Sequence, residues 1–376
     1  MVTLSHAKRS TVLTKTWLSV LAITLLFSAA NLQAAIDRSL TSDQQGPATI
    51  RLTDGSLIMG VVTGIRDDAL QVKTAFSDAD LAIHLSLVDS LQWQAETKLL
   101  LDDDRLVIVP ALDVDGGKID LGGKELPLVD IDIMNPADWE TGDGYHWTGD
   151  ASMAFALNRG NTETDEFDVK VNSVLESAVN RYTFNGHVER DEAHNRVVVD
   201  DREVTQSAMT ADNWKLLGKY DHFLSDPINY LGANASIEAD ALAGVKLRTY
   251  AGPYYGRKLL DNDDYKLDGE LGIAYVSTEY DADVNQEDNN YTGLNWNFTG
   301  ESSLLGGDSR LYLRHIGIID ISDSDQLILK NTLGLAFPLV YGLEAAAEMT
   351  INYDGTAAAD RDKVDEVYSF RVGYAW

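Results

Sequence analysis

Cysteine is absent from this chain of 376 residues. Its absence excludes disulfide bonds, thiol catalysis and metal sites built on thiolates. A protein without disulfides is held together by burial and hydrogen bonding, and a closed β-barrel provides both. Long apolar runs are also missing after the first 34 residues. The sequence therefore predicts no transmembrane helix in the mature protein, because such a helix needs about 20 consecutive apolar residues.

Basic residues are scarce. The chain has 30 Lys and Arg residues against 60 Asp and Glu residues, a formal net charge of −30. Nucleic-acid binding is excluded, because it needs a cationic surface that displaces counterions from phosphates. The excess acid is compatible with a well-solvated surface or with loops that bind divalent cations.

The N-terminus has the features of an export signal. Lys8, Arg9 and Lys15 form a basic lead, an apolar core runs from Trp17 to Phe27, and small residues follow near Ala34. The apolar core is well short of the ~20 residues that span a bilayer. We therefore predict that residues 1–34 are a signal peptide removed during export.

Residues 35–135 contain a degenerate internal repeat. Three segments recur, Leu52–Leu57 as Leu101–Leu106, Ala69–Val72 as Lys118–Leu121, and Leu85–Asp89 as Leu126–Asp130. Apolar and polar residues alternate in each copy and stop at Asp/Gly turns, the pattern of short antiparallel strands. The region is predicted to be a β-rich periplasmic domain of two SH3-like or Sm-like units. Pro and Gly then mark residues 136–146 as a linker.

From Trp147 to Trp376 the alternation becomes longer and stricter. On one segment Phe167, Val169 and Val171 alternate with Asp168 and Lys170. This pattern predicts an all-β fold, an antiparallel transmembrane β-barrel of about 12 strands with one face toward lipid and a polar lumen. A soluble β-sandwich also alternates, but its strands are typically ~5–6 residues long. Strands are expected to start near Trp147, Asp165, Arg181, Thr205, Ile228, Val245, Tyr265, Asn290, Ser309, Asp325, Gly342 and Lys363.

The connections between these strands alternate in length. The longer, acidic ones are expected at 191–204, 280–290 and 354–363 and would face the outside. That phase puts the N-terminal domain and the C-terminus in the periplasm. One strand is irregular, because Leu311 and Leu313 share a face that runs into His315 while Ile316 and Ile318 take the other. A β-bulge is predicted there.

Charges of both signs occupy the polar face of the predicted barrel. The candidate lumen charges are Asp168, Lys170, Lys215, Lys219, Lys246, Arg248, Lys266, Asp268, Glu270, Glu344, Glu348 and Arg371. Because the two signs nearly balance, cross-strand pairs are expected to close or narrow the interior. The sequence therefore does not predict a wide diffusion pore.

The last strand ends the chain on an aromatic residue. Tyr368, Phe370, Val372, Tyr374 and Trp376 share one face. A terminal aromatic on an alternating strand resembles the assembly signal read by the outer-membrane insertion machinery. The expected partners are that machinery and the lipid and lipopolysaccharide of a Gram-negative outer membrane.

The stretches 147–152 and 157–164, with the Gly-Asn-Thr turn at Gly160, resemble the opening hairpin of one family, the salt-induced outer-membrane proteins of domain of unknown function 481. The closing Tyr374-Ala375-Trp376 adds to this resemblance. It covers about 147–376, and the preceding β-rich units resemble the domains often found before that barrel. The family implies the fold and an outer-membrane location, but it supplies no catalytic residues or cofactor.

Several functions remain open. The chain is expected to be an outer-membrane barrel that takes part in the envelope response to salt or forms a narrow solute channel. Alternatively it is a structural or binding barrel whose periplasmic domain docks an envelope partner. A barrel lipase or protease is the third reading. It is disfavoured, because the neighbours Asp221 and His222 would point to opposite faces of a strand.

No cofactor is predicted. The weak metal candidates are the acidic residues Asp320, Asp323 and Asp325, whose oxygens suit Ca²⁺ or Mg²⁺. A solvated acidic loop is the favoured interpretation of this segment.

Overall fold

The structure is a computed structural model. It describes residues 47–376 except 78, 122, 159–161, 200, 201, 263, 283, 285, 304, 307, 308 and 358–361. The predicted signal peptide, residues 1–34, lies outside the described residues. The chain divides into two compact units between Ala137 and Asp138. Among the described residues, no helix is long and apolar enough to cross a membrane.

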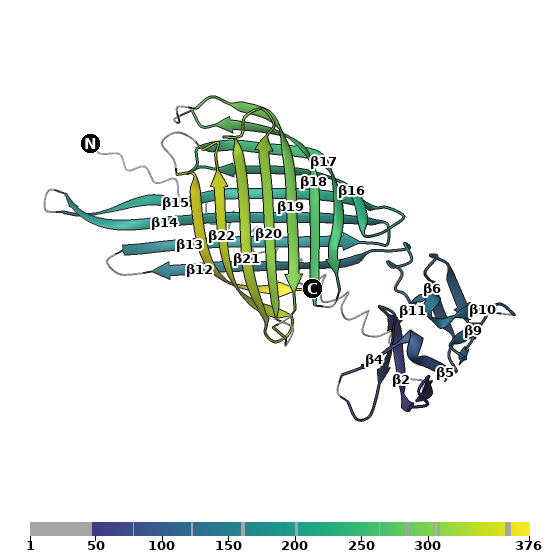
Figure 1. The fold of residues 1–376 in the computed structure, drawn as a ribbon. Coiled ribbons are helices and arrows are strands. Elements are labelled where there is room, and N and C mark those ends of the chain that lie inside the picture. The colour runs from purple at the N-terminus through teal and green to yellow at the C-terminus, as the bar shows by residue number, and fades with distance from the viewer. Residues whose placement is uncertain are drawn as a thin grey trace. The chain divides into compact units, whose positions relative to one another are not determined.

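The N-terminal unit consists of short strands and two 3₁₀ turns (Figure 1). Its elements are β1 (Ala48–Leu52), β2 (Leu57–Arg66), β3 (Ala69–Lys73), β4 (Leu81–His84), η1 (Leu85–Leu87), β5 (Val88–Trp93), β6 (Thr97–Leu101), β7 (Leu106–Val109), β8 (Leu112–Asp115), β9 (Lys118–Asp120), β10 (Glu125–Pro127), η2 (Leu128–Asp130) and β11 (Ile131–Met134). The first repeat has the strand order β5-β1-β2-β3-β4. In the second repeat, β11-β6-β7 and β8-β9-β10 reproduce this order, with β7 and β8 standing where the first repeat has the single strand β2.

The two repeats agree in detail at their turns. Asp67 and Asp68 have positive φ, and so do their counterparts Gly116 and Gly117, as a tight two-residue hairpin requires. The amide of Leu85 donates to the carbonyl of Asp68 at 2.8 Å, and the amide of Leu128 donates to Gly117 at 2.9 Å. Leu85 therefore corresponds to Leu128. The sequence alignment, which matched it with Leu126, was two residues out of register here.

Pairing between β5 and β8 joins the repeats. Their inward apolar residues form one core, and its fully buried members include Ile50, Leu70, Leu99 and Leu128. Burial of this shared core stabilises both repeats together, at roughly 25 cal/mol per Å² of apolar surface.

The C-terminal unit is a closed antiparallel barrel of twelve strands among the described residues (Figure 1). The strands are β12 (His146–Asn158), β13 (Thr162–Glu176), β14 (Asn180–Val199), β15 (Arg202–Phe223), β16 (Asn229–Asp240), β17 (Val245–Asp261), β18 (Tyr265–Tyr280), β19 (Asn289–Ser302), β20 (Arg310–Asp320), β21 (Leu327–Pro338), β22 (Leu343–Asp354) and β23 (Val364–Ala375). Each begins within three residues of the start expected from the alternation. The predicted fold class is confirmed.

The barrel has two rims. The first rim carries the start of β12, the end of β23 and the turn that joins β13 to β14, and the second rim carries the turn from β12 to β13. Before the first strand, the carbonyl of Trp139 accepts a hydrogen bond from Ala178, and the ring of Trp139 stacks on His146. The segment expected to be a linker thus contacts the barrel from Asp138 onward.

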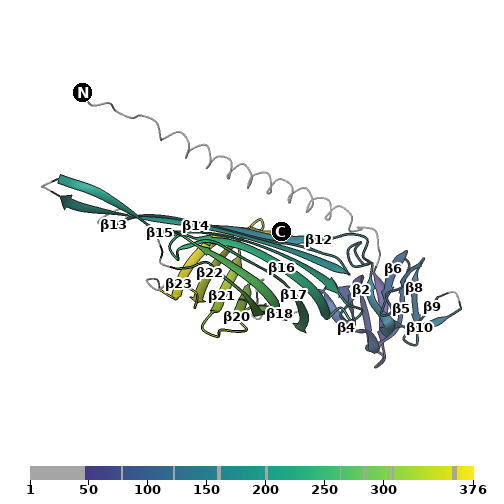
Figure 2. The same ribbon diagram turned by 90° about the horizontal axis from the view of Figure 1, so that it is seen from above.

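Two local expectations are wrong. Residues 191–204 are not a long loop, since β14 and β15 stay paired as far as Val199 and Arg202. The paired ends of β14 and β15 form an arm that extends beyond the other strands (Figures 1 and 2). Strand β20 pairs with both neighbours without the predicted bulge. His315 simply lies on the outer face, where it accepts a hydrogen bond from Trp296 Nε1 at 2.8 Å.

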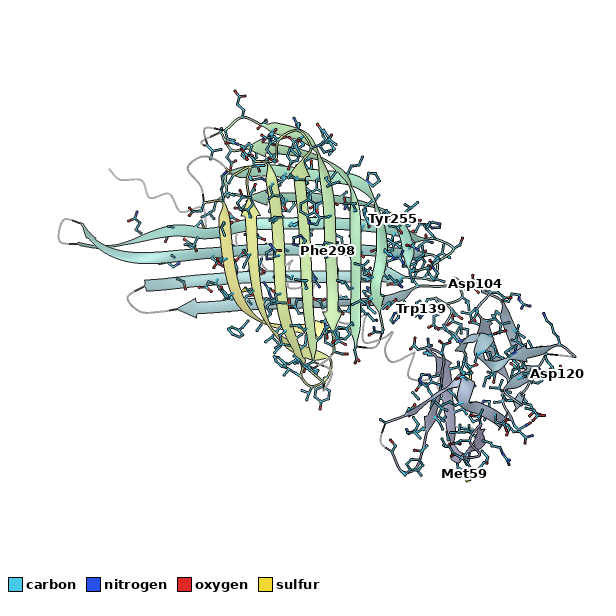
Figure 3. All side chains as sticks on the ribbon, viewed as in Figure 1. Met59, Asp104, Asp120, Trp139, Tyr255 and Phe298 are labelled. Atoms are coloured by element: carbon cyan, nitrogen blue, oxygen red, sulfur yellow. The ribbon has the colours of Figure 1, made fainter. Side chains whose placement is uncertain are left out.

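The outer face of the barrel is apolar. Exposed apolar side chains on this face include Met153, Phe167, Leu175, Phe184, Trp214, Leu231, Tyr255, Leu271, Ile273, Phe298, Leu313 and Leu333. Tyr255 and Phe298 are labelled in Figure 3. A continuous apolar surface of this kind is what a strand presents to lipid when its other face lines a lumen.

Candidate functional site: a lumen crossed by ion pairs

The first group of lumen charges lies near the first rim. Arg181 at the start of β14 contacts Asp221 on β15 at 2.8 Å and Asp268 on β18 at 3.1 Å. The second contact crosses the interior between strands four positions apart. Tyr254 also donates to the fully buried carboxylate of Asp221. Lys219 pairs with Glu270 at 2.5 Å. We call this set the first-rim network.

The second group lies where the barrel closes, and we call it the seam network. Glu348 on β22 accepts from Lys170 on β13 at 2.6 Å and from Arg371 on β23 at 2.6 Å. Arg371 also pairs with Asp168 on β13. His187 contacts the other oxygen of Asp168 at 3.0 Å. These contacts connect β13 to β22 and β23, across the first strand of the barrel.

The third group, the second-rim network, is centred on Glu238 of β16. Lys330 of β21 reaches this carboxylate at 2.6 Å from five strands away, and Lys215 lies at 3.5 Å. Arg248 of β17 contacts Glu238 at 3.3 Å and Asp354 of β22 at 2.7 Å. Because a ring of twelve strands is widest at a separation of six, these contacts reach almost across the full interior.

Apolar residues fill part of the lumen. A buried cluster on the inward face consists of Leu217, Tyr250, Ala274, Val276, Tyr291, Ile318 and Ile328. A cavity of about 790 Å³ remains beside it, and its lining includes Asp150, Glu238, Lys330, Glu348 and Arg371. The interior is therefore a partly packed core with a polar chamber, rather than the uniformly polar lumen that the alternation suggested.

Glycines on the inward face of the barrel leave room for tyrosine rings from neighbouring strands. A Cβ on Gly334 would lie 2.1 Å from Tyr312, and one on Gly256 would lie 2.1 Å from Tyr230. Such close approach is open only to glycine. In this position the Tyr312 hydroxyl donates to Glu348 at 2.7 Å, and the Tyr230 hydroxyl donates to Glu270 at 3.1 Å. The glycines thus let aromatic rings join the ion-pair networks.

The three networks contain most of the charges predicted for the lumen. They bring together Asp168, Lys170, Lys215, Lys219, Arg248, Asp268, Glu270, Glu348 and Arg371. Glu344 pairs instead with Arg310 at 3.2 Å. Lys246 is exposed and contacts Glu279 at 3.1 Å, and Lys266 is exposed near the start of β18.

Four participants were missed at the level of sequence. Glu238, Arg310, Lys330 and Asp354 all follow the inward phase of their strands, so the same alternation would have found them. The inward tyrosines were not foreseen, because alternation alone does not distinguish an aromatic ring facing lipid from one packed into the lumen.

The acidic candidates for a metal site accept hydrogen bonds from residues two or three positions further along the chain. Asp320 accepts from the amide and hydroxyl of Ser322, both at 2.9 Å. Asp323 accepts from the amide of Asp325 at 3.1 Å and from Gln326 at 3.2 Å. These hydrogen bonds shape the turn between β20 and β21. No group of His, Asp and Glu side chains arranged to hold a metal ion is found among the described residues.

The terminal strand presents its aromatic face outward. Tyr368, Phe370 and Val372 are exposed, whereas Tyr374 and Trp376 are half-buried. The assembly role of this strand stays a prediction.

One histidine has neighbours that resemble a hydrolytic triad. His194 Nδ1 lies 2.7 Å from Ser207 Oγ, and its Nε2 lies 3.6 Å from Asp165. All three residues belong to β13, β14 or β15 near the extended arm, and none lines the lumen cavity. The arrangement is a set of polar contacts across three neighbouring strands, away from the lumen cavity.

A comparison with family models gives one match. Residues 151–376 match the family described as protein of unknown function, DUF481. The chain belongs to this family. The match covers the barrel from Ala151 to Trp376 and confirms the family resemblance. No curated protein matches the chain by sequence.

Solved structures similar to the chain are bacterial barrels. The outer membrane channel DcaP of Acinetobacter baumannii is 9% identical, covers 62% of this chain and 96% of its own, and has a TM-score of 0.29. The translocator domain of the autotransporter NalP from Neisseria meningitidis is 14% identical, with coverages of 62% and 88% and a TM-score of 0.32. The fold of this DUF481 member is established by its own strand pairing.

Proposed function

We propose that this chain is an integral outer-membrane barrel that anchors its N-terminal domain in the periplasm and is closed to axial diffusion. The observation that supports closure is the set of ion pairs that cross the lumen, above all Lys330 with Glu238 and Arg248 with Asp354. Buried pairs of this kind are expensive to separate, because each partner would be left as an uncompensated charge. A structural or binding role therefore fits better than a diffusion pore or an enzyme.

The membrane location is supported by the two faces of the wall. The twelve strands pair into a ring, which β12 and β23 close, and the outer face of that ring is apolar, as a barrel wall in lipid requires. Heat-modifiable migration of the protein from an outer-membrane fraction tests this. Protease added to spheroplasts should remove the N-terminal domain, whereas protease added to intact cells should not. Removal of the domain in intact cells would refute the proposed orientation.

Planar-bilayer recording tests the closed lumen. The wild-type protein should show small or no conductance steps. The double variant K330S/R248S removes two of the three cations of the second-rim network, the two whose ion pairs cross the lumen, and should produce stable openings. The matched control is Lys246→Ser, because Lys246 is exposed and pairs only with Glu279 in the described structure. Large, stable openings from the wild-type protein would overturn the proposal.

Deletion of residues 35–135 separates anchoring from partner binding. If the barrel still assembles and growth at high salt is impaired, the N-terminal domain carries the role and the barrel is its anchor. If the barrel assembles and growth at high salt is unchanged, the docking proposal fails. If the barrel no longer assembles, the domain is a folding aid. Growth at high salt with and without residues 35–135 also tests the role in the envelope response to salt that the family resemblance implied.

A further inference from the structure

The barrel closes through an unusually short seam. Strands β12 and β23 are paired over only four residues, from Asp150 with Ala375 to Met153 with Val372. Every other pair of neighbouring barrel strands is registered over ten residues or more. Beyond Met153, residues 154–158 of β12 and 364–371 of β23 have no strand partner on their facing edges among the described residues.

This gap begins at mid-height in the wall and continues to the second rim. Ser369 is in the middle of β23 and pairs on its other side with Glu348, in the middle of β22. Unpaired backbone amides and carbonyls are strongly disfavoured in lipid, which offers them no hydrogen bonds. The open edges are therefore a feature that the fold must either close or use.

Three side chains beside the gap are the most exposed apolar residues on the described barrel strands. Phe370 is 84% exposed, Tyr368 is 69% exposed and Phe155 is 64% exposed, and Tyr275 follows at 57%. The continued register of the two strands would place Phe155 opposite Phe370. Their exposure shows that this pair of rings is not closed against each other.

A second set of contacts bridges the seam from inside. Lys170 and Asp168 of β13 reach Glu348 and Arg371 on the far side of β12. The residues of β12 paired with Lys170 and Asp168 are Ser152 and Ala154, and these small side chains leave room for the contacts to pass. The seam network therefore acts as a latch that holds β13 to β22 and β23 where the backbone pairing has ended.

The gap has a polar side and an apolar side. The lumen cavity is lined at the seam by Ser152, Arg371 and Gly373. On the outer face, a groove of about 270 Å³ runs along Leu333, Met349, Tyr368 and Phe370 and reaches Glu348. Two carboxylates and two cations balance one another in the latch, so the seam carries no excess charge for a strongly charged head group.

We propose that the seam between β12 and β23 is a lateral gate through which a single-chain amphiphile with a neutral or zwitterionic head group passes between the bilayer and the lumen cavity. The aromatic groove receives the chain and the polar cavity receives the head group. The ion pairs that cross the lumen block the axial route, so exchange occurs through the wall. This inference rests on the proposed membrane insertion of the barrel.

The absence of cysteine allows a direct test with the full chain in lipid vesicles. Two double variants, M153C/V372C and F155C/F370C, are oxidised and analysed on a non-reducing gel. Cysteine pairs must lie within about 7 Å between Cα atoms to bridge. The first pair should cross-link readily and the second at a yield about threefold lower or less, as an open seam requires. Equal yields would show a closed wall and overturn the gate.

The latch is tested with a matched pair of variants. Glu348→Gln weakens the bridging contact with Lys170 and the contact that positions Arg371 for Asp168, whereas Glu344→Gln lies on the same strand and face and affects only Arg310. Each is combined with Ser152→Cys, and pyrene maleimide dissolved in the bilayer is the probe. Labelling of Cys at 152 should occur and should be several-fold faster with Glu348→Gln, but unchanged with Glu344→Gln. No labelling, or equal acceleration by both variants, would refute the proposal.

The failure of the gate is distinguishable from that of the proposed function. Heat-modifiable migration is recorded for every variant, so that unfolded protein is recognised. A heat-modifiable barrel whose two cysteine pairs cross-link equally contradicts the gate alone. A chain that is not heat-modifiable even as the wild type contradicts membrane insertion itself.

Discussion

Replacement of Arg181 by Met tests whether the lumen networks hold the barrel together. Arg181 lies 2.8 Å from Asp221, whose side chain is fully buried. At that separation and an effective dielectric constant of about 20, the attraction is roughly 6 kcal/mol. Desolvation of both groups offsets part of it. Removing only the cation leaves a buried charge, which typically costs about 3–5 kcal/mol.

The assay is urea unfolding of the barrel in lipid vesicles, followed by heat-modifiable migration. Arg181→Met should lower the free energy of unfolding by about 3–5 kcal/mol. Adding Asp221→Asn should recover much of the loss, because the neutral amide removes the unpaired charge and still accepts from Tyr254. The control is Lys258→Met, whose half-exposed partner Asp261 makes its loss worth about 1 kcal/mol or less. The reasoning fails if Arg181→Met costs no more than Lys258→Met, or if the second change brings no recovery.

Three further expectations follow from individual residues. Gly334→Ala should destabilise the barrel by about 1–3 kcal/mol in the same assay, because the new Cβ displaces Tyr312. Gly218→Ala should be nearly neutral, since a Cβ there meets open space. Equal effects of the two changes would contradict the idea that Gly334 makes room for the Tyr312 ring. Deletion of Trp376 should reduce the amount of folded barrel in outer-membrane fractions while Leu339→Ala does not, if the terminal aromatic is an assembly signal. Burial, and then the neighbouring Asp130, raise the pKa of the Asp102 carboxyl in the N-terminal unit. Ionisation of Asp102 therefore opposes folding, so stability falls as pH rises through its raised pKa, and Asp102→Asn should slow amide exchange in β6 at pH 7 but not below pH 3.

The fold was largely readable from the sequence because a barrel strand repeats one simple rule. Each strand must show lipid one face and the lumen the other, so apolar and polar residues alternate with period two. Lys170 and Asp168 stand out as inward charges for that reason, and the strand starts follow from the breaks in the alternation. The internal repeat was also visible, although its third segment was aligned two residues away from the structural match of Leu85 with Leu128.

The partners of the lumen charges were decided by tertiary structure. Arg371 meets Asp168, and Lys330 meets Glu238, across separations of 203 and 92 residues. These meetings depend on the shear with which the sheet closes and on how far opposite strands lie apart, and alternation contains neither quantity. The length of the seam pairing was also decided by tertiary structure. Both of its strands read as ordinary barrel strands in sequence, yet only closure of the ring shows that their pairing stops at Met153 and Val372. The sequence by itself thus determined which residues face inward, and the closed barrel decided which of them bind each other and where the wall is left open.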